Sequence, residues 1–204
     1  WANSKASKDL MFLGSSGQLS QAGRALVLSS TADLMKAVRK CLKLSPRDCA
    51  KGPYGAIGEW DVSGITDMNR VFAEAHSFNG DISGWDVSSV VSMATMFVQA
   101  RSFNGDLSKW DVSSVADMSG TFGDASVFNG ELSKWDVSRV SKMSFMFRDA
   151  EMFDSDISKW DVSSVQNMYG MFQSASSFNG DISNWDVSRV ENMNGMFQRA
   201  SSFH

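Results

Sequence analysis

The chain has 204 residues, of which 43% are hydrophobic and 21% are charged, and this composition is that of a folded protein rather than a disordered one. Its net charge is −4 with both signs interspersed, so it lacks the basic patch that nucleic-acid binding requires. No apolar run approaches the roughly 20 residues of a membrane span. We therefore expect neither a nucleic-acid partner nor a membrane span.

Residues 1–29 are predicted to form an N-terminal arm. The segment mixes small and polar residues with scattered apolar ones, and an apolar patch at 10–13 precedes the turn signal at 14–17. Two interpretations stay open: an arm that packs on the first repeat or on a partner, and a loosely ordered terminus. Because the first residue is Trp1 and not Met, we expect either a removed targeting segment or an excerpt of a longer chain.

Residues 30–52 are predicted to form a capping helix and a loop. Ser30 or Thr31 can cap a helix that runs to Leu44, and Pro46 and Pro53 confine the loop that follows. Apolar residues recur on one helical face at Leu34, Val38, Cys41 and Leu42. A repeat array needs a cover for its apolar end, so we expect this helix to cover the first repeat.

Cysteine occurs only at Cys41 and Cys49, both outside the repeats. This pair can form a disulfide or remain as two reduced thiols, and export of the protein would favour the disulfide.

A 25-residue unit recurs over residues 53–204 without insertion or deletion. Tryptophan marks its period at residues 60, 85, 110, 135, 160 and 185. Methionine keeps the same period at residues 68, 93, 118, 143, 168 and 193. Such a period is typical of a stack in which each unit contacts its neighbours. We therefore expect a third region of six coils over 53–204.

Within each unit the spacing predicts a short strand and a short helix. Residues 81–85 alternate polar and apolar, which favours a strand, and Asn79-Gly80 is a turn signal. The residues Met93, Met96, Phe97 and Ala100 fall at i, i+3, i+4 and i+7, on one face of two helical turns. The expected fold class is thus an α/β repeat, with parallel strands stacked about 4.8 Å apart.

The unit reads Trp-Asp-Val-Ser-Ser-Val-x-x-Met-x-x-Met-Phe-x-x-Ala-x-x-Phe-Asn-Gly-Asp-Ile-Ser and resembles the repeat of the BspA-like leucine-rich-repeat surface proteins of bacteria and unicellular algae. The resemblance covers about residues 53–204, and the segments 34–38 and 54–57 also resemble that family's lead-in. It implies a right-handed, leucine-rich-repeat-like solenoid. For function it implies cell-surface adhesion or protein binding in some members, and no assigned function in most.

Two columns of acidic residues run through the units. One consists of Asp61, Asp86, Asp111, Asp136, Asp161 and Asp186, and the other of Asp81, Asp106, Glu131, Asp156 and Asp181. Stacked carboxylates can bind calcium, whereas single aspartates accept backbone N–H groups in Asx turns. We favour the Asx turns because calcium-binding repeats carry denser Gly and Asp.

Four further features have alternative explanations. The asparagines at 79, 104, 129 and 179 suit recognition or, as we favour, a buried ladder between coils. The methionines suit core packing better than a binding surface, and the tryptophans suit partial burial better than a carbohydrate platform. Asp154-Ser155 replaces Asn-Gly in the fifth coil, and we expect an altered turn there because Ser enters positive φ less readily than Gly.

The candidate partner face consists of positions that vary from one repeat to the next. Lys109, Lys134 and Lys159 repeat at one position and Arg139 and Arg189 at another, which predicts a basic stripe on an acidic protein or a solvated surface. His76 and His204 lie at variable and terminal positions, and no catalytic motif is present, so we expect no enzyme activity and no cofactor.

These observations predict a non-catalytic, protein-binding array of the surface-adhesin or scaffold type, located outside the cell or on its surface. The alternative is a structural subunit of a large assembly, in an organelle lumen or another membrane-associated setting, and a carbohydrate-binding module is a third hypothesis. Expected contact regions are the variable coil face, the N-terminal arm and the last coil, for which the sequence offers no cap.

Overall fold

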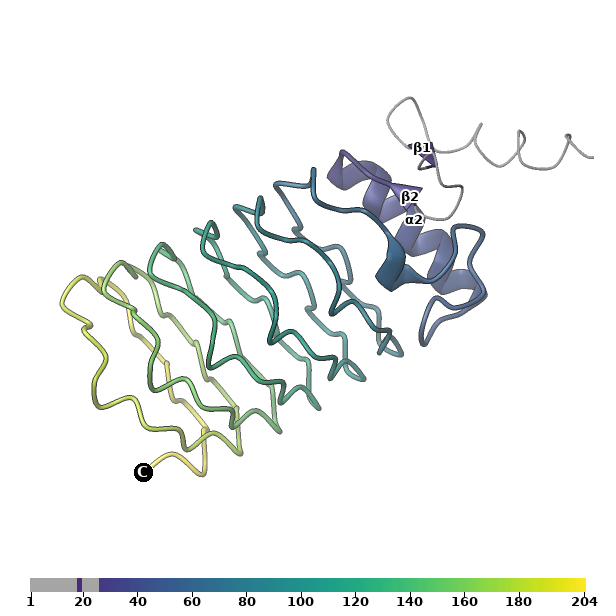
Figure 1. Ribbon diagram of the computed structural model, residues 1–204. Coiled ribbons are helices and arrows are strands. Elements are labelled where there is room, and N and C mark those ends of the chain that lie inside the picture. Colours follow the sequence, from purple (N-terminus) through teal and green to yellow (C-terminus); the bar gives the residue numbers. More distant parts are fainter. Residues whose placement is uncertain (1–17, 20–25) are drawn as a thin grey trace, which may run out of the picture.

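The computed structural model describes residues 18–19 and 26–204, so the apolar patch at 10–13 lies outside the described residues. The elements are the strands β1 (Gln18–Leu19) and β2 (Leu26–Val27), the helix α2 (Thr31–Leu44) and the 3-10 helix η2 (Ile57–Glu59). After η2 the chain winds in coils that lie side by side along one axis, with α2 across their N-terminal end (Figure 1). We number the coils from first to sixth, at 53–77, 78–102, 103–127, 128–152, 153–177 and 178–204.

Helix α2 forms where the capping pattern places it. The Ser30 hydroxyl accepts the N–H of Asp33 at 3.2 Å and donates to the Asp33 carboxylate at 2.7 Å, which satisfies a free donor of the first turn. Its apolar face buries Leu34, Ala37, Val38 and Cys41. The helix expected over 30–44 is therefore present, and it covers the first coil.

Strand β2 adds a second contact to the first coil. It pairs antiparallel with β1, and Val27 forms a parallel bridge with Asp61. The N–H of Leu28 donates to the Asp61 carbonyl at 2.9 Å, and the N–H of Asp61 donates to the Leu26 carbonyl at 2.8 Å. Leu26 and Leu28 are fully buried, so residues 26–28 of the expected arm pack on the first coil.

The predicted α/β repeat, a right-handed leucine-rich-repeat-like solenoid with a strand and a helix in each coil, is wrong. Residues 60–204 contain turns and irregular chain with neither helix nor strand, and successive coils are joined by isolated parallel bridges. The bridges connect Asp67, Ser92, Asp117, Lys142, Asn167 and Asn192 in order.

The backbone hydrogen bonds explain why the helical spacing does not produce a helix. In the second coil, N–H groups of alternate residues donate to the third coil; the donors are Met93, Thr95, Phe97 and Gln99. The residues that follow the last three of these donors, Met96, Val98 and Ala100, donate to the carbonyl three residues earlier. An α-helix needs every N–H to bond four residues back, so this alternation excludes it while leaving the apolar spacing intact.

Two left-handed columns accompany this alternation. Positive φ recurs in one column at Arg70, Thr95, Gly120, Phe145, Gly170 and Gly195. It recurs in a second column at Glu74, Gln99, Asp124, Asp149, Ser174 and Arg199. Single left-handed residues tighten the chain into consecutive turns, which is how a coil closes without regular secondary structure.

The core consists of ladders of aromatic rings between coils. Phe97 stacks on Phe122 of the next coil at 5.5 Å between ring centroids with 2° between planes, and Phe122 stacks on Phe128 within its own coil at 3.9 Å. These rings are fully buried, and so are the methionines that share the interior, which are Met68, Met93, Met96, Met118, Met143, Met146, Met168 and Met171. The aromatic and methionine columns therefore form the interior of the stack.

In the Asn-Gly turns glycine leaves room for a phenylalanine ring, although the fifth coil accommodates Ser155 at the same position. A Cβ on Gly105 would lie 2.9 Å from the Phe103 ring, whereas neither Gly105 nor its counterparts Gly80, Gly130 and Gly180 has positive φ. Ser155 has no positive φ either, so the backbone reason given for an altered turn at Asp154-Ser155 is wrong. Ser155 is instead buried, and its hydroxyl donates to the Gly130 carbonyl at 2.8 Å.

The sixth coil presents an uncovered face. Val187 and Met193 are 37% and 42% exposed, while their counterparts Val162 and Met168 are 1% and 0% exposed. The four N–H groups that would donate to a following coil have no acceptor among residues 18–19 and 26–204; they belong to Met193, Gly195, Phe197 and Arg199.

Candidate functional site

The aspartate columns are engaged in local turns. The Asp111 carboxylate accepts the N–H of Ser113 at 3.0 Å and its hydroxyl at 2.6 Å, and Asp86 and Asp161 bond their serines in the same way. The serine hydroxyl and then the serine N–H lower the pKa of Asp111 below its usual range. These are Asx turns. Across the described residues, no group of three or more His, Cys, Asp or Glu side chains is placed to hold a metal ion.

The asparagine column forms a ladder between coils. The side-chain oxygen of Asn79 accepts the N–H of Asn104 at 2.9 Å, and Asn104 accepts that of Asn129 at 2.9 Å. Asp154 takes the same part in the fifth coil, where its carboxylate accepts the N–H of Asn179 at 2.8 Å. The ladder matches the interpretation favoured from sequence, but its residues are exposed rather than buried.

The tryptophan column is interior rather than a platform for sugars. Trp85, Trp110, Trp135, Trp160 and Trp185 are 3–8% exposed, and each indole N–H donates to a carbonyl of the preceding coil. Trp60 is equally buried, but its indole N–H has no partner within the described part of the chain.

The lysines of the candidate partner face form one exposed row beside acidic residues. Lys109, Lys134 and Lys159 occupy the same position in the third, fourth and fifth coils, and all three are exposed. Lys109 and Lys134 add to the serine hydrogen bonds that lower the pKa of Asp106. A depression of about 450 Å³ runs beside Lys134, lined also by Asp106 and Glu131. The face is therefore of mixed charge.

The two arginines of that face lie in a different column. Arg139 and Arg189 are exposed in the fourth and sixth coils, three residues after Asp136 and Asp186. Each lowers the pKa of that aspartate, after the larger effect of the serine hydrogen bonds. The structure thus assigns the five cations to two columns, each beside a column of carboxylates.

A second depression is lined by residues that were not predicted from the sequence as site residues. We call it the glycine notch: a hollow of about 300 Å³ between the second and fourth coils. Its lining includes Thr95, Val98, Gly120, Gly123, Asp124, Phe145 and Arg148. A partial sequence signal exists, because Gly123 stands where each of the other five coils carries a larger side chain, whereas Gly120 shares its position with Gly170 and Gly195.

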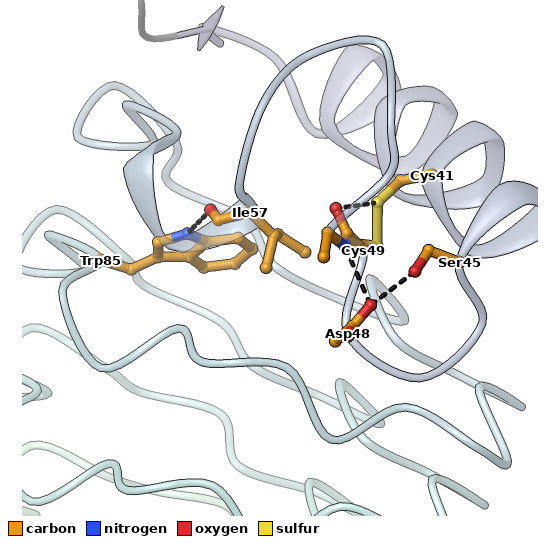
Figure 2. The surroundings of a disulfide bond; sticks show 7 residues. Cys41, Ser45, Asp48, Cys49, Ile57 and Trp85 are labelled. Atoms are coloured by element: carbon orange, nitrogen blue, oxygen red, sulfur yellow. Dashed lines mark hydrogen bonds between the residues drawn. A yellow bond between two sulfur atoms is a disulfide. The ribbon is translucent and has the colours of Figure 1, made fainter.

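The two cysteines are joined by a disulfide between α2 and the loop that follows it (Figure 2). Both residues are fully buried. Below the disulfide the Asp48 carboxylate accepts the Ser45 hydroxyl and the N–H of Ala50, and these bonds lower the Asp48 pKa. The same loop reaches the repeats, because the Arg47 carbonyl accepts the N–H of Asn79 at 2.7 Å.

None of the helices in the described residues is long and apolar enough to cross a membrane. No curated protein and no solved structure matches the chain. A family model matches residues 47–150 and 130–204, which together cover most of the 204 residues. The chain therefore belongs to the family described as "Mycoplasma protein of unknown function, DUF285".

Proposed function

We propose that the protein is a non-catalytic, protein-binding repeat array of the surface-adhesin or scaffold type. One observation carries the proposal: the recurring columns are engaged in packing and hydrogen bonds between coils, whereas the columns that vary most in charge are exposed. The lysine row is the clearest case, since Lys109, Lys134 and Lys159 make no ion pair within 4.0 Å in the described part of the molecule.

A location outside the cell or on its surface accompanies this proposal. The disulfide between Cys41 and Cys49 supports it, because such bonds persist mainly in oxidising compartments. The resemblance of the unit to the BspA-like surface proteins supports it as well, on sequence motif alone.

The proposal is tested with an array of purified secreted and surface proteins from the source organism, printed beside a glycan array. We expect saturable binding to at least one protein and none to glycans. Replacing Lys109, Lys134 and Lys159 by Gln should weaken that binding at least tenfold, whereas the same change at Lys36, Lys43 and Lys51 should not. Binding only to glycans, or to nothing, would contradict the proposal.

A further inference from the structure

We infer that the glycine notch docks an extended segment of a partner protein that carries an apolar side chain next to a lysine or arginine. This inference rests on the proposed protein-binding function and assigns it a site other than the lysine row.

The notch exists because the third coil lacks side chains where its neighbours have them. The other coils carry Ala73, Val98, Arg148, Gln173 and Gln198 at the position of Gly123. Gly123 does not have positive φ, and a Cβ there would meet its neighbours only at 3.4–3.6 Å, an ordinary contact distance. Neither backbone conformation nor packing requires glycine at this position, so the hollow is not a by-product of the fold.

Two residues that line the notch have left-handed backbone conformations. Phe145 and Thr95 have φ of 58° and 55°, in a column where three other coils carry glycine. Left-handed backbone is unfavourable for a residue with a Cβ, and it is least common for bulky and β-branched residues. Backbone strain of this kind collects at functional sites. Two of the residues that carry this strain, Thr95 and Phe145, line the hollow.

The contacts of Phe145 favour a polypeptide over a sugar. The Arg148 guanidinium lies over its ring at 5.4 Å, and Tyr169 meets it edge to face at 4.8 Å with 80° between planes. Its ring also leans across Gly170, where a Cβ would lie 2.7 Å away. A sugar needs an open aromatic face. The methyl groups of Val98 and Thr95 and the volume of about 300 Å³ suit one apolar side chain and the backbone beside it.

The charged residues beside the notch favour a particular residue of the partner, the one next to its apolar side chain. Asp124 lines both the notch and an adjoining depression of about 400 Å³ that also includes Arg101, Asp149 and Glu151. Arg148 donates to Asp124 at 3.3 Å and to Asp149 at 2.8 Å, so it is already paired. The three carboxylates exceed the two guanidinium groups by one charge, which favours a cation on the partner.

The test uses NMR amide shifts of the 204-residue protein titrated with three synthetic peptides. They share a flexible Gly-Ser frame and differ at two central residues, which are Leu-Lys, Leu-Glu or Ala-Lys. We expect saturable shifts of the Gly120, Gly123 and Asp124 amides with Leu-Lys, and at least tenfold weaker binding of the other two. Replacing Gly123 by Leu should fill the notch and weaken Leu-Lys binding at least tenfold, whereas Gln198→Leu, in the same column, should not.

Two further variants keep the test decisive. Phe145→Gly removes a wall but suits the left-handed backbone, so it should fold and lose binding even if Gly123→Leu does not fold. Asp124→Asn should reduce the preference for Leu-Lys over Leu-Glu at least threefold. Shifts confined to the lysine row would overturn this inference and leave the proposed function standing. Absence of shifts with all three peptides would overturn the inference, while the protein array judges the proposed function separately.

Discussion

At the residue scale, the most repeated side-chain contact joins an aspartate to the serine two positions later. The pairs are exposed, and each lowers the pKa of its aspartate through the serine hydroxyl and N–H, as Asp86, Asp111 and Asp161 show. The sequence motif Asp-x-Ser predicts this contact well, because the bond is local and needs no knowledge of the fold.

Removal of one serine hydroxyl should have a small and pH-dependent effect. Ser113→Ala should raise the pKa of Asp111 toward its usual value of about 3.9. It should lower the free energy of unfolding at pH 7 by about 0.5–1 kcal/mol, since the pair is exposed. NMR titration and urea unfolding would measure both effects. Ser114→Ala is the control, because the Ser114 hydroxyl makes no hydrogen bond with the described residues.

The sign of the pH dependence follows from the direction of the pKa shifts. A carboxyl whose pKa is lower in the folded state stabilises the fold above the unfolded pKa of about 3.9, and that contribution is lost as pH falls through the folded pKa. Many aspartates of both columns share this direction, including Asp81, Asp106, Asp136 and Asp186. The difference between Ser113→Ala and the parent chain should therefore vanish in strong acid. A constant difference down to pH 2 would contradict the assignment.

The left-handed columns could not be read from the sequence, because Arg70, Glu74 and Phe145 occupy positions where a turn signal would need Gly or Asn. A matched pair of substitutions tests them. Gly195→Ala should cost about 1 kcal/mol from backbone strain alone, since φ is 68° and a Cβ would meet only Gln198 at 3.6 Å. Gly123→Ala should be neutral or stabilise by up to about 1 kcal/mol. Equal effects in thermal unfolding would refute the distinction.

At the element scale, sequence reasoning succeeded where the structure is local and failed where it depends on the next coil. Helix α2 carries its own signals, from the Ser30 cap to one apolar face. In the coils, the N–H groups of Met93 and Thr95 donate to the next coil, whereas that of Met96 donates within its own coil. The neighbouring coil therefore determines which N–H groups can form the turns of a helix. Side-chain spacing records which residues are buried, but not whether their N–H groups bond within or between coils.

The tryptophan ladder permits a test of the hydrogen bonds between coils. Trp110→Phe leaves the Ile82 carbonyl without its indole donor, whereas Trp60→Phe removes an N–H that has no partner in the described residues. Both changes remove the same atoms from sites 3–4% exposed. Trp110→Phe should therefore cost about 1–3 kcal/mol more in the free energy of unfolding. Denaturant titration gives the comparison, and a larger loss for Trp60→Phe would contradict the ladder.

The disulfide should stabilise the junction between α2 and the first coil. Replacing Cys41 and Cys49 by Ala should lower the free energy of unfolding by about 2–4 kcal/mol. Because the loop between them contacts Asn79, hydrogen exchange should accelerate at the Asn79 amide more than at the Asn129 amide two coils away. Uniform acceleration along the whole chain would show that the bond acts on the unfolded state alone.

At the whole-molecule scale, the 25-residue period explains which side chains are buried, because a column of equivalent residues can be buried in every unit only if the six coils lie in register. The aromatic ladders follow that register, as Phe72, Phe97 and Phe122 show. The sequence distinguishes Gly123 from its counterparts, but it does not predict the glycine notch itself, because the lining comes from three coils at once.

A deletion that respects the period should preserve the stack. Removing residues 103–127 keeps every column aligned, so the shortened chain should unfold cooperatively at a lower midpoint and keep its tryptophans buried. Removing 103–115 instead leaves a coil too short to close, and tryptophan emission should move toward that of exposed indole. Emission spectra and thermal melts distinguish the two deletions. An equal loss of stability in both would contradict a stack whose repeating unit is the 25-residue coil.

The hydrogen bonds between coils have a consequence for how such genes change. From the second to the fifth coil, each coil accepts four backbone N–H groups from the coil before it and donates four to the coil after it. A unit duplicated in the gene therefore adds a coil without leaving a donor or an acceptor unmatched. The number of coils can change in whole units over generations while α2 and the disulfide keep their architecture.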